Sequence, residues 1–217
     1  MRSKSAGVYR LTAVHDGAEI SELRLEYLAK TGGFSANREA MVWGDRDEES
    51  LVLGVRSEAG RWIASMRAEI LSIGESLIPK MDYDPIDELV DPRSLRGVLG
   101  KEVTHPDFRG LGLNTYLRQL ALEYLLSQGV QTVVTTVKTA APRVAVLGQI
   151  GTRFFLNKEG WRRFGYQSMG PTLVGILDLS EHGEKAIRTL RQRNIEVQHQ
   201  FPNCVAEREA ASAAYAV

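Results

Sequence analysis

The segment Gly97–Ser127 constrains the fold of this chain most, because it joins a strand, a tight turn and a helix. Gly97–Thr104 has the short apolar pattern of a strand, and Pro106 ends it because proline cannot donate a ladder hydrogen bond. A turn containing two glycines then leads into the helix expected at Leu113–Ser127. Apolar side chains recur at helical spacing in that helix at Leu113, Leu117, Leu120 and Tyr124. The segment therefore predicts a buried strand that passes directly into the first turn of a helix.

The rest of the chain alternates between strand and helix patterns. Val130–Val137 is rich in β-branched residues and predicts a strand buried on both faces. Further strands are expected at Gly7–Val14, Ser50–Arg56, Arg61–Ile70, Phe164–Ser168 and Thr172–Leu179. Further helices are expected at Glu19–Lys30, from Pro142 to about Asn157, and in the charged segment that begins at Glu181. This order predicts the α/β or α+β class, with a mixed sheet and helices on both faces.

We expect a single domain with a C-terminal addition. Residues 1–180 carry all the strand patterns, and residues 181–217 read as a helical extension of the same domain with an Ala-rich tail. The segment Gly74–Ser94 contains three prolines, and we interpret it as an irregular insertion with one helical turn around Ile86–Val90.

Composition excludes several classes of protein. The 27 basic residues balance the 27 acidic ones, so no net charge favours binding to nucleic acid. The single cysteine, Cys204, cannot form an internal disulfide, and the four histidines have no metal-ligand spacing, so we expect no metal site. No signal peptide and no apolar run of roughly 18 residues is present, which predicts a cytoplasmic protein without a membrane span.

The turn before the long helix has the chemistry of an anion site. The first turn of a helix presents unpaired N–H groups and a partial positive charge. Gly110 and Gly112 let the backbone approach a ligand closely, and Arg109 adds a positive charge. The alternative is that these glycines only tighten a strand–helix turn. A Rossmann motif or a P-loop fits poorly, because the third glycine of the first and the Gly-Lys-Ser/Thr of the second are missing.

The run Thr104-His-Pro-Asp-Phe-Arg-Gly-Leu-Gly-Leu-Asn114 resembles the acyl-coenzyme A signature of the GNAT superfamily of N-acyltransferases. The resemblance implies a mostly antiparallel central sheet, an acyl-CoA donor such as acetyl-CoA, and a fourth and fifth strand that splay apart around the pantetheine arm. The residues that it assigns to the cofactor are Val103, Thr104, Arg109, Gly110, Leu111, Gly112, Leu113 and Asn114. Asn114 departs from the pattern, because the family usually has Gly or Ala there.

A second segment extends this likeness toward the C-terminus. Thr152–Trp161, followed by Phe164–Tyr166, is similar to the family's helix that ends in a bulky residue before Gly-Phe. The family commonly has a Tyr in this segment as the acid for the leaving thiolate, whereas this chain has Phe155 or Leu156 there. Tyr166 is our candidate replacement, and catalysis by water or by positioning alone stays open.

Glu102 is our candidate for the general base that removes the proton of the amine. It lies in an otherwise apolar strand, so its carboxyl should have either a raised pKa or a charged partner. The alternative is that Glu102 faces solvent or pairs with Lys101 or Arg67. For His105 we expect a phosphate-binding or structural role rather than that of the base.

A narrower resemblance links the N-terminal half to acyl-homoserine-lactone synthases and N-acyl amino acid synthases, which take long acyl chains from acyl carrier protein. It depends on Arg24–Tyr27, on Trp43–Asp47 and on Arg67, which we expect to bind substrate. The alternative is that Arg24 and Arg67 form ion pairs with Asp45, Asp47 or Glu69 while Trp43 packs in the core.

The function expected from the sequence is transfer of an acyl group, acetyl first, from acyl-CoA to a primary amine by direct attack. The acceptor would be a small molecule or a peptide. Two alternatives remain, a long-chain N-acyl amino acid synthase served by acyl carrier protein and a non-catalytic acyl-CoA-binding module. The C-terminal extension makes a homodimer plausible.

Overall fold

The computed structural model describes residues 9–15, 17–30, 41–160, 171–200 and 206–208. Their centre is an eight-stranded sheet with the order β6-β7-β5-β4-β3-β2-β1-β8. The strands are β1 (Tyr9–Ala13), β2 (Leu51–Arg56), β3 (Trp62–Leu71), β4 (Arg96–Thr104), β5 (Thr132–Lys138), β6 (Arg153–Asn157), β7 (Thr172–Asp178) and β8 (Ala206–Arg208). Only the β4–β5 and β1–β8 pairs are parallel in this described sheet, which confirms the predicted mixed and mostly antiparallel architecture.

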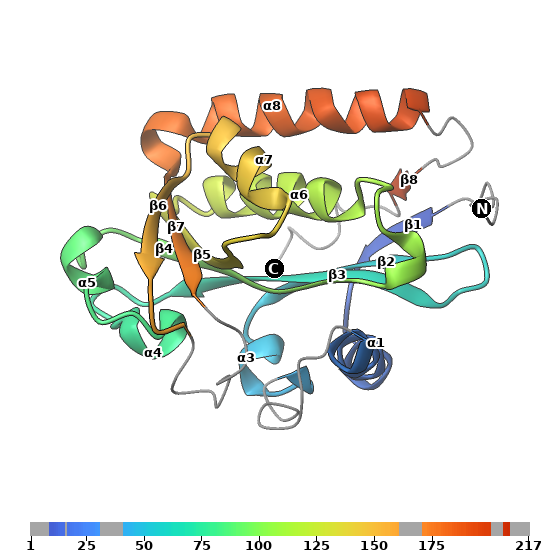
Figure 1. Ribbon diagram of the computed structural model, residues 1–217, viewed down its shortest axis with the longest axis horizontal. Coiled ribbons are helices and arrows are strands. Elements are labelled where there is room, and N and C mark those ends of the chain that lie inside the picture. The colour runs from blue at the N-terminus through green and yellow to red at the C-terminus, as the bar shows by residue number, and fades with distance from the viewer. Residues whose placement is uncertain (1–8, 16, 31–40, 161–170, 201–205, 209–217) are drawn as a thin grey trace.

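Helices cover both faces of the sheet, as predicted (Figure 1). They are α1 (Gly17–Lys30), α3 (Asp45–Glu48), α4 (Ile78–Met81), α5 (Ile86–Leu89), α6 (Leu113–Ser127), α7 (Arg143–Gln149) and α8 (Leu179–Gln200), with a 3-10 turn at Pro106–Phe108. Figure 1 shows α6, α7 and α8 on one face and α1, α3 and α4 on the other. No helix in the described ranges combines the length and the apolar character needed to cross a membrane.

The side chains of β5 alternate between two hydrophobic cores, one on each face of the sheet. Val133 and Val137 pack into the large core beneath α6 and α8, whereas Val134 packs into a smaller core on the opposite face. Leu77, Met81, Ile86 and Val90 of the 74–94 insertion complete that smaller core. The insertion is therefore a packed layer with two helical turns, α4 and α5, rather than an irregular segment with one.

The β4–β5 ladder is short, and this opens the sheet. The parallel pairing runs only from Arg96 opposite Thr132 to Leu99 opposite Thr135. On its other edge, β4 contains a β-bulge, because Ser65 and Arg67 of β3 pair with Val103 and Gly100 and leave one extra residue in β4. Lys101 lies in this bulge with a φ of 49°. Because β4 continues to Thr104 and β5 to Lys138 beyond the end of their pairing, the predicted splay of the two strands is confirmed.

The prediction of one helix from Pro142 to about Asn157 is wrong. Helix α7 ends at Gln149, Gly151 adopts a φ of 93°, and β6 begins at Arg153. Phe154 packs against the large core and Phe155 against the smaller one, which is the two-residue alternation of a strand. The helical reading of Thr152–Trp161 in the family resemblance is wrong for the same reason over Arg153–Asn157. The predicted strand Phe164–Ser168 lies outside the described residues.

Helix α8 is part of the main core. Its Ala186, Ile187 and Leu190 are buried in the same cluster as the apolar face of α6. Further along the chain, β8 pairs in parallel with β1 at the edge of the sheet, a strand that the sequence analysis did not predict. The C-terminal segment is thus joined to the rest of the molecule at both α6 and β1.

Candidate active site

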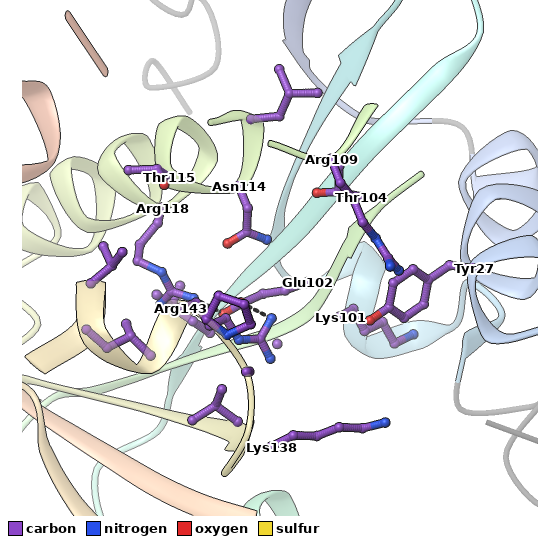
Figure 2. Close-up of a pocket in the computed structure, with 18 of the residues that line it drawn as sticks. Tyr27, Lys101, Glu102, Thr104, Arg109, Asn114, Thr115, Arg118, Lys138 and Arg143 are labelled. Carbon is purple, nitrogen blue, oxygen red and sulfur yellow. Dashed lines mark hydrogen bonds and ion pairs between the residues drawn. The ribbon is translucent and has the colours of Figure 1, made fainter. Parts of the chain in front are cut away.

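A cavity of about 710 Å³ occupies the gap between β4 and β5. Residues of α6, α7 and the 3-10 turn line it from one face of the sheet, and residues of α1 line it from the other. Its position matches the gap predicted to hold a pantetheine arm. Figure 2 shows the polar side chains that point into it.

The N-terminus of α6 forms one end of the cavity. Gly110 and Gly112 have φ angles of 83° and 70°, a left-handed conformation that side chains with a Cβ rarely adopt. Gly112 caps the helix, and the amide of Tyr116 donates the first helical hydrogen bond to the carbonyl of Gly112. The N–H groups of the first helical residues therefore have no acceptor inside the helix, and Leu113, Asn114 and Thr115 line the cavity. This arrangement suits a phosphate group.

Arg109 lies beside this helix end. Its guanidinium carbon is 5.6 Å from the centre of the Tyr27 ring, so a cation–π contact from α1 orients the side chain at the cavity wall. The arginine thus adds a fixed positive charge to the anion site formed by the backbone.

Six of the eight residues predicted to hold the cofactor line the cavity: Thr104, Arg109, Gly110, Gly112, Leu113 and Asn114. Val103 and Leu111 do not. Alternation along β4 directs the side chain of Val103 into a core cluster with Val14 and Ile20, and Leu111 is buried in the large core next to α6. These two side chains stabilise the turn from the side away from the cavity.

Glu102 lies in the cavity wall, but its carboxylate is held by two arginines. Oε1 accepts a hydrogen bond from Arg118 of α6, and Oε2 lies 2.9 Å from Nη1 of Arg143 of α7. The Glu102 and Arg118 side chains are each only 4% exposed. Figure 2 shows both guanidinium groups converging on this carboxylate. The charged partners are therefore Arg118 and Arg143, and not Lys101 or Arg67, which the alternative interpretation had named.

This environment argues against Glu102 as the general base. Burial acts to raise the pKa of Glu102, but the charges of Arg118 and Arg143 outweigh it, and the pKa lies below its ordinary value. A carboxylate with a lowered pKa is a weak proton acceptor, and both of its oxygens are occupied by cations. The geometry instead makes Glu102 a group that positions Arg118 and Arg143 at the cavity wall.

The remaining candidates for proton transfer are tyrosines and His105. Tyr166 lies outside the described residues, and the phenol that lines the described part of the cavity is Tyr27 of α1. His105 is buried just outside the cavity, where its Nδ1 accepts a hydrogen bond from the amide of Asp107. Its Nε2 lies 3.4 Å from Oε1 of Glu26, so His105 links the turn between β4 and α6 to α1. This is the structural role considered for it.

Arg67 is part of a buried ion-pair network rather than the cavity lining. Its Nη2 lies 3.3 Å from a carboxylate oxygen of Glu69, and its Nη1 lies 3.7 Å from one of Asp47. Arg24 donates to Asp47 across 3.0 Å. The alternative interpretation of Arg24 and Arg67 as ion-paired residues is confirmed. Arg67 is not among the residues that line the cavity, and its contact with substrate stays a prediction.

Lys101 connects this network to the cavity. Its Nζ donates to Oδ2 of Asp47 across 2.6 Å and to the carbonyl of Val42 across 2.9 Å, and the residue lines the cavity. Burial, followed by the nearby charge of Arg24, lowers the pKa of Lys101 to about 8 although Asp47 acts in the opposite direction.

Sequence reasoning missed several polar residues of the cavity, among them Lys101, Arg118, Lys138, Arg143 and Thr172. One signal was present, because Arg118 follows Asn114 by four residues and so shares its helix face. The others come from separate strands and helices, and no local pattern joins them. In the described ranges no group of three or more His, Cys, Asp or Glu side chains could hold a metal ion.

No family model and no curated protein sequence matches this chain. Solved structures do. FeeM, an N-acyl amino acid synthase from uncultured soil microbes, is 8% identical with a TM-score of 0.62, over 89% of this chain and 98% of FeeM. NAA60 of Arabidopsis thaliana in complex with a bisubstrate analogue is 12% identical with a TM-score of 0.59, over 77% of this chain and 98% of NAA60. BjaI, a CoA-dependent acyl-homoserine lactone synthase, is 16% identical with a TM-score of 0.55, over 94% of this chain and 93% of BjaI. The chain therefore has the GNAT fold that the resemblance implied.

Proposed function

We propose that this protein is an N-acyltransferase that moves an acyl group from acyl-CoA to an amine. The observation that carries the proposal is the cavity in the β4–β5 gap, which begins at the open N-terminus of α6 and reaches the face of α1. The helix end suits the pyrophosphate, and the gap suits the pantetheine arm. The thioester would then lie near the β4 bulge, where an acceptor can reach it from the opposite face.

The chemistry proposed is direct attack. The amine nitrogen attacks the thioester carbonyl, a C–N bond forms, and the C–S bond of the tetrahedral intermediate breaks. The amine loses a proton to water, and the departing thiolate takes one up from water, so no acyl-enzyme is needed. The cavity positions the two reactants and presents cationic groups at Lys101 and Arg143 to the developing negative charge.

Acetyl-CoA is our first candidate for the donor, and a long-chain donor is the second. The similarity to FeeM over 89% of this chain favours the second, as do the apolar side chains of Leu28, Met41, Val146 and Leu147 along the cavity. In that case an acyl carrier protein is the proposed partner in place of coenzyme A. A non-catalytic acyl-CoA-binding module is the remaining alternative, and homodimer formation is a separate proposal.

Calorimetric titration with acetyl-CoA and with palmitoyl-CoA tests the proposal. We expect micromolar binding that Arg109→Glu abolishes, because the change reverses a charge at the phosphate site. Arg188→Glu is the matched control, since it makes the same charge change at an exposed position of α8.

A thiol-release assay with a panel of primary amines then separates the enzyme from a binding module. Binding without thiol release from any amine would favour the module. Absence of binding by either donor would contradict the coenzyme A proposal and leave the carrier-protein donor to be tested with an acylated carrier protein. Tighter binding of the long chain would favour the second donor.

A further inference from the structure

The two faces of the cavity differ in how their charges are paired. On the α6 face, Glu102, Arg118 and Arg143 neutralise one another in part. On the opposite face, Lys101 and Lys138 are both cationic, and no carboxylate lines that face among the described residues. Figure 2 shows Lys138 extending away from the Glu102 cluster.

Strand register establishes that Lys138 and Thr172 share this second face. Lys138 of β5 lies directly opposite Thr172 of β7 in an antiparallel pair, so their side chains point to the same side of the sheet. Val134 and Val174 belong to the same alternating sets, and both pack into the smaller core on the face away from α6. Lys138 and Thr172 therefore line the part of the cavity on the acceptor side of the sheet.

Thr172 provides an unpaired hydroxyl at this site. The residue is 1% exposed, and its Oγ1 has no hydrogen-bond partner among the described residues. A buried hydroxyl without a partner is unfavourable, because it has lost its hydrogen bonds to water and gained none in return. A ligand that offers an acceptor oxygen beside Lys138 would satisfy this hydroxyl and bind the ammonium group at once.

The surrounding network adds to the positive charge. Five basic side chains share three carboxylates in the described ion pairs: Arg24, Arg46, Arg67, Lys80 and Lys101 against Asp47, Glu69 and Glu75. Two of these carboxylates, Asp47 and Glu69, are almost fully buried, so water screens the excess positive charge only weakly. An amine that also carries positive charge would be repelled here, whereas an acceptor with an acidic group would be attracted.

We propose that the acceptor is an amine with a carboxylate, such as an α-amino acid, and that Lys138 and Thr172 bind the carboxylate. Lys101 supplies the adjacent positive charge at the bulge. This inference rests on the proposed function, because it names the acceptor class of the same site. It also selects against polyamines, which lack an anionic group.

The test compares L-α-amino acids with their α-amides, which keep the amine and the side chain but lack the charge. In the thiol-release assay we expect kcat/KM to be about tenfold or more higher for the acids, as loss of a charged hydrogen bond typically costs this much or more. Lys138→Gln and Thr172→Val should raise KM for the acids at nearly constant kcat. The same variants should not change KM for the amides, which have no carboxylate. Lys185→Gln, at an exposed position of α8, is the matched control and should change neither.

A direct binding measurement separates this inference from the proposed function. We would titrate the same acids and amides, with spermidine as a cationic amine, into the protein with saturating coenzyme A and also without it. Preferential binding of the acids that Lys138→Gln weakens supports the acceptor class even if no acyl transfer is detected. Equal or tighter binding of amides or spermidine overturns it, as does an equal effect of Lys138→Gln on acids and amides. Binding and acylation of neutral amines alone would leave the acyltransferase proposal standing while this inference fails.

Discussion

At the scale of single residues, charge pairing decides what each candidate can do. Glu102 is the acidic residue that the strand pattern singled out, and the fold surrounds it with Arg118 and Arg143. The same residue type therefore acts as a counter-ion rather than as a proton acceptor. Its contribution should appear in stability as well as in activity.

Replacing Glu102 with Gln should destabilise the protein strongly. The change removes the negative charge but keeps the shape, which leaves two arginines without a counter-ion in the cavity wall. Loss of one partner of a buried ion pair typically costs about 3–5 kcal/mol. Urea denaturation of the variant measures this cost.

Glu123→Gln is the matched control for that experiment, because Glu123 pairs with Arg191, whose side chain is 59% exposed. Exposed pairs contribute about 1 kcal/mol or less, so this variant should unfold nearly as the wild type does. If Glu102→Gln kept full stability and lost only kcat, Glu102 would be the general base and our interpretation would be wrong.

Glu26 gives the protein a predictable response to acid. The hydrogen bond from Lys30, together with one from Arg61, lowers the pKa of Glu26 from 4.5 to about 2, although partial burial opposes the shift. A lowered carboxyl pKa stabilises the folded state above pH 4.5, and this stabilisation is lost as the pH falls toward 2. Glu26→Gln should thus be less stable than the wild type at neutral pH, and the difference should shrink on acidification.

Denaturation at a series of pH values checks this expectation, with Glu22→Gln at an exposed position of the same helix as control. If the difference in unfolding free energy between Glu26→Gln and the wild type stayed constant down to pH 2, the Glu26 carboxylate would not be the source of the stabilisation.

At the scale of elements, the ends of strands and helices create the site. The β4–β5 pairing ends at Leu99, next to the bulge at Lys101, and Gly112 turns the chain so that the first residues of α6 line the gap. Neither element is unusual alone, but together they form a cavity that has the N-terminus of α6 at one end, where we propose that the phosphates bind.

Gly112→Ala should lower both stability and acyl-CoA affinity. A Cβ at a φ of 70° costs about 1–2 kcal/mol, and relief of that strain would turn the helix amides away from the phosphates. Gly129→Ala is a matched control at the other end of α6, because Gly129 has a φ of 77° and open space around it. We expect a similar loss of stability in both variants and at least a tenfold loss of affinity only in Gly112→Ala, measured by calorimetry. Equal affinities would contradict the anion site.

At the scale of the whole molecule, the C-terminal helix is part of the fold. The buried side chains of α8 pack with those of α6 in one cluster, although the charged sequence of this segment suggested an extension. The protein should therefore unfold as one cooperative unit across this contact.

Leu190→Ala tests whether the protein unfolds as one cooperative unit. Leu190 is fully buried, and truncation of a buried leucine typically costs about 2–5 kcal/mol. We expect that loss in a single transition followed by circular dichroism and by tryptophan fluorescence. Ile195→Ala, on the same helix but 42% exposed, should have a much smaller effect. Separate transitions for the two probes would mean that α8 is an independent extension.

The sequence by itself determined the features that depend on neighbouring residues along the chain, namely most strands and the turn before α6. Alternation and β-branching predicted β2, β3, β4, β5 and β7, and the glycines Gly110 and Gly112 predicted the tight turn into α6, because such features reflect local backbone preferences. Local preference also explains why the helix predicted from Pro142 to about Asn157 is wrong. The apolar residues after Pro142 fit a helix, but the left-handed Gly151 ends it. Phe154 and Phe155 then pack on opposite faces of the sheet, as in a strand.

Only the tertiary structure decided how distant residues share charge and space. Glu102 and Arg143 lie in different elements, as do Arg67 and Asp47, and pairing between them depends on which faces the sheet brings together. The same holds for Lys138 and Thr172, which meet because β5 and β7 are neighbours in the sheet while β6 lies between them in sequence. Electrostatic free energy depends on distance in space and on burial, and neither quantity can be read from positions along the chain.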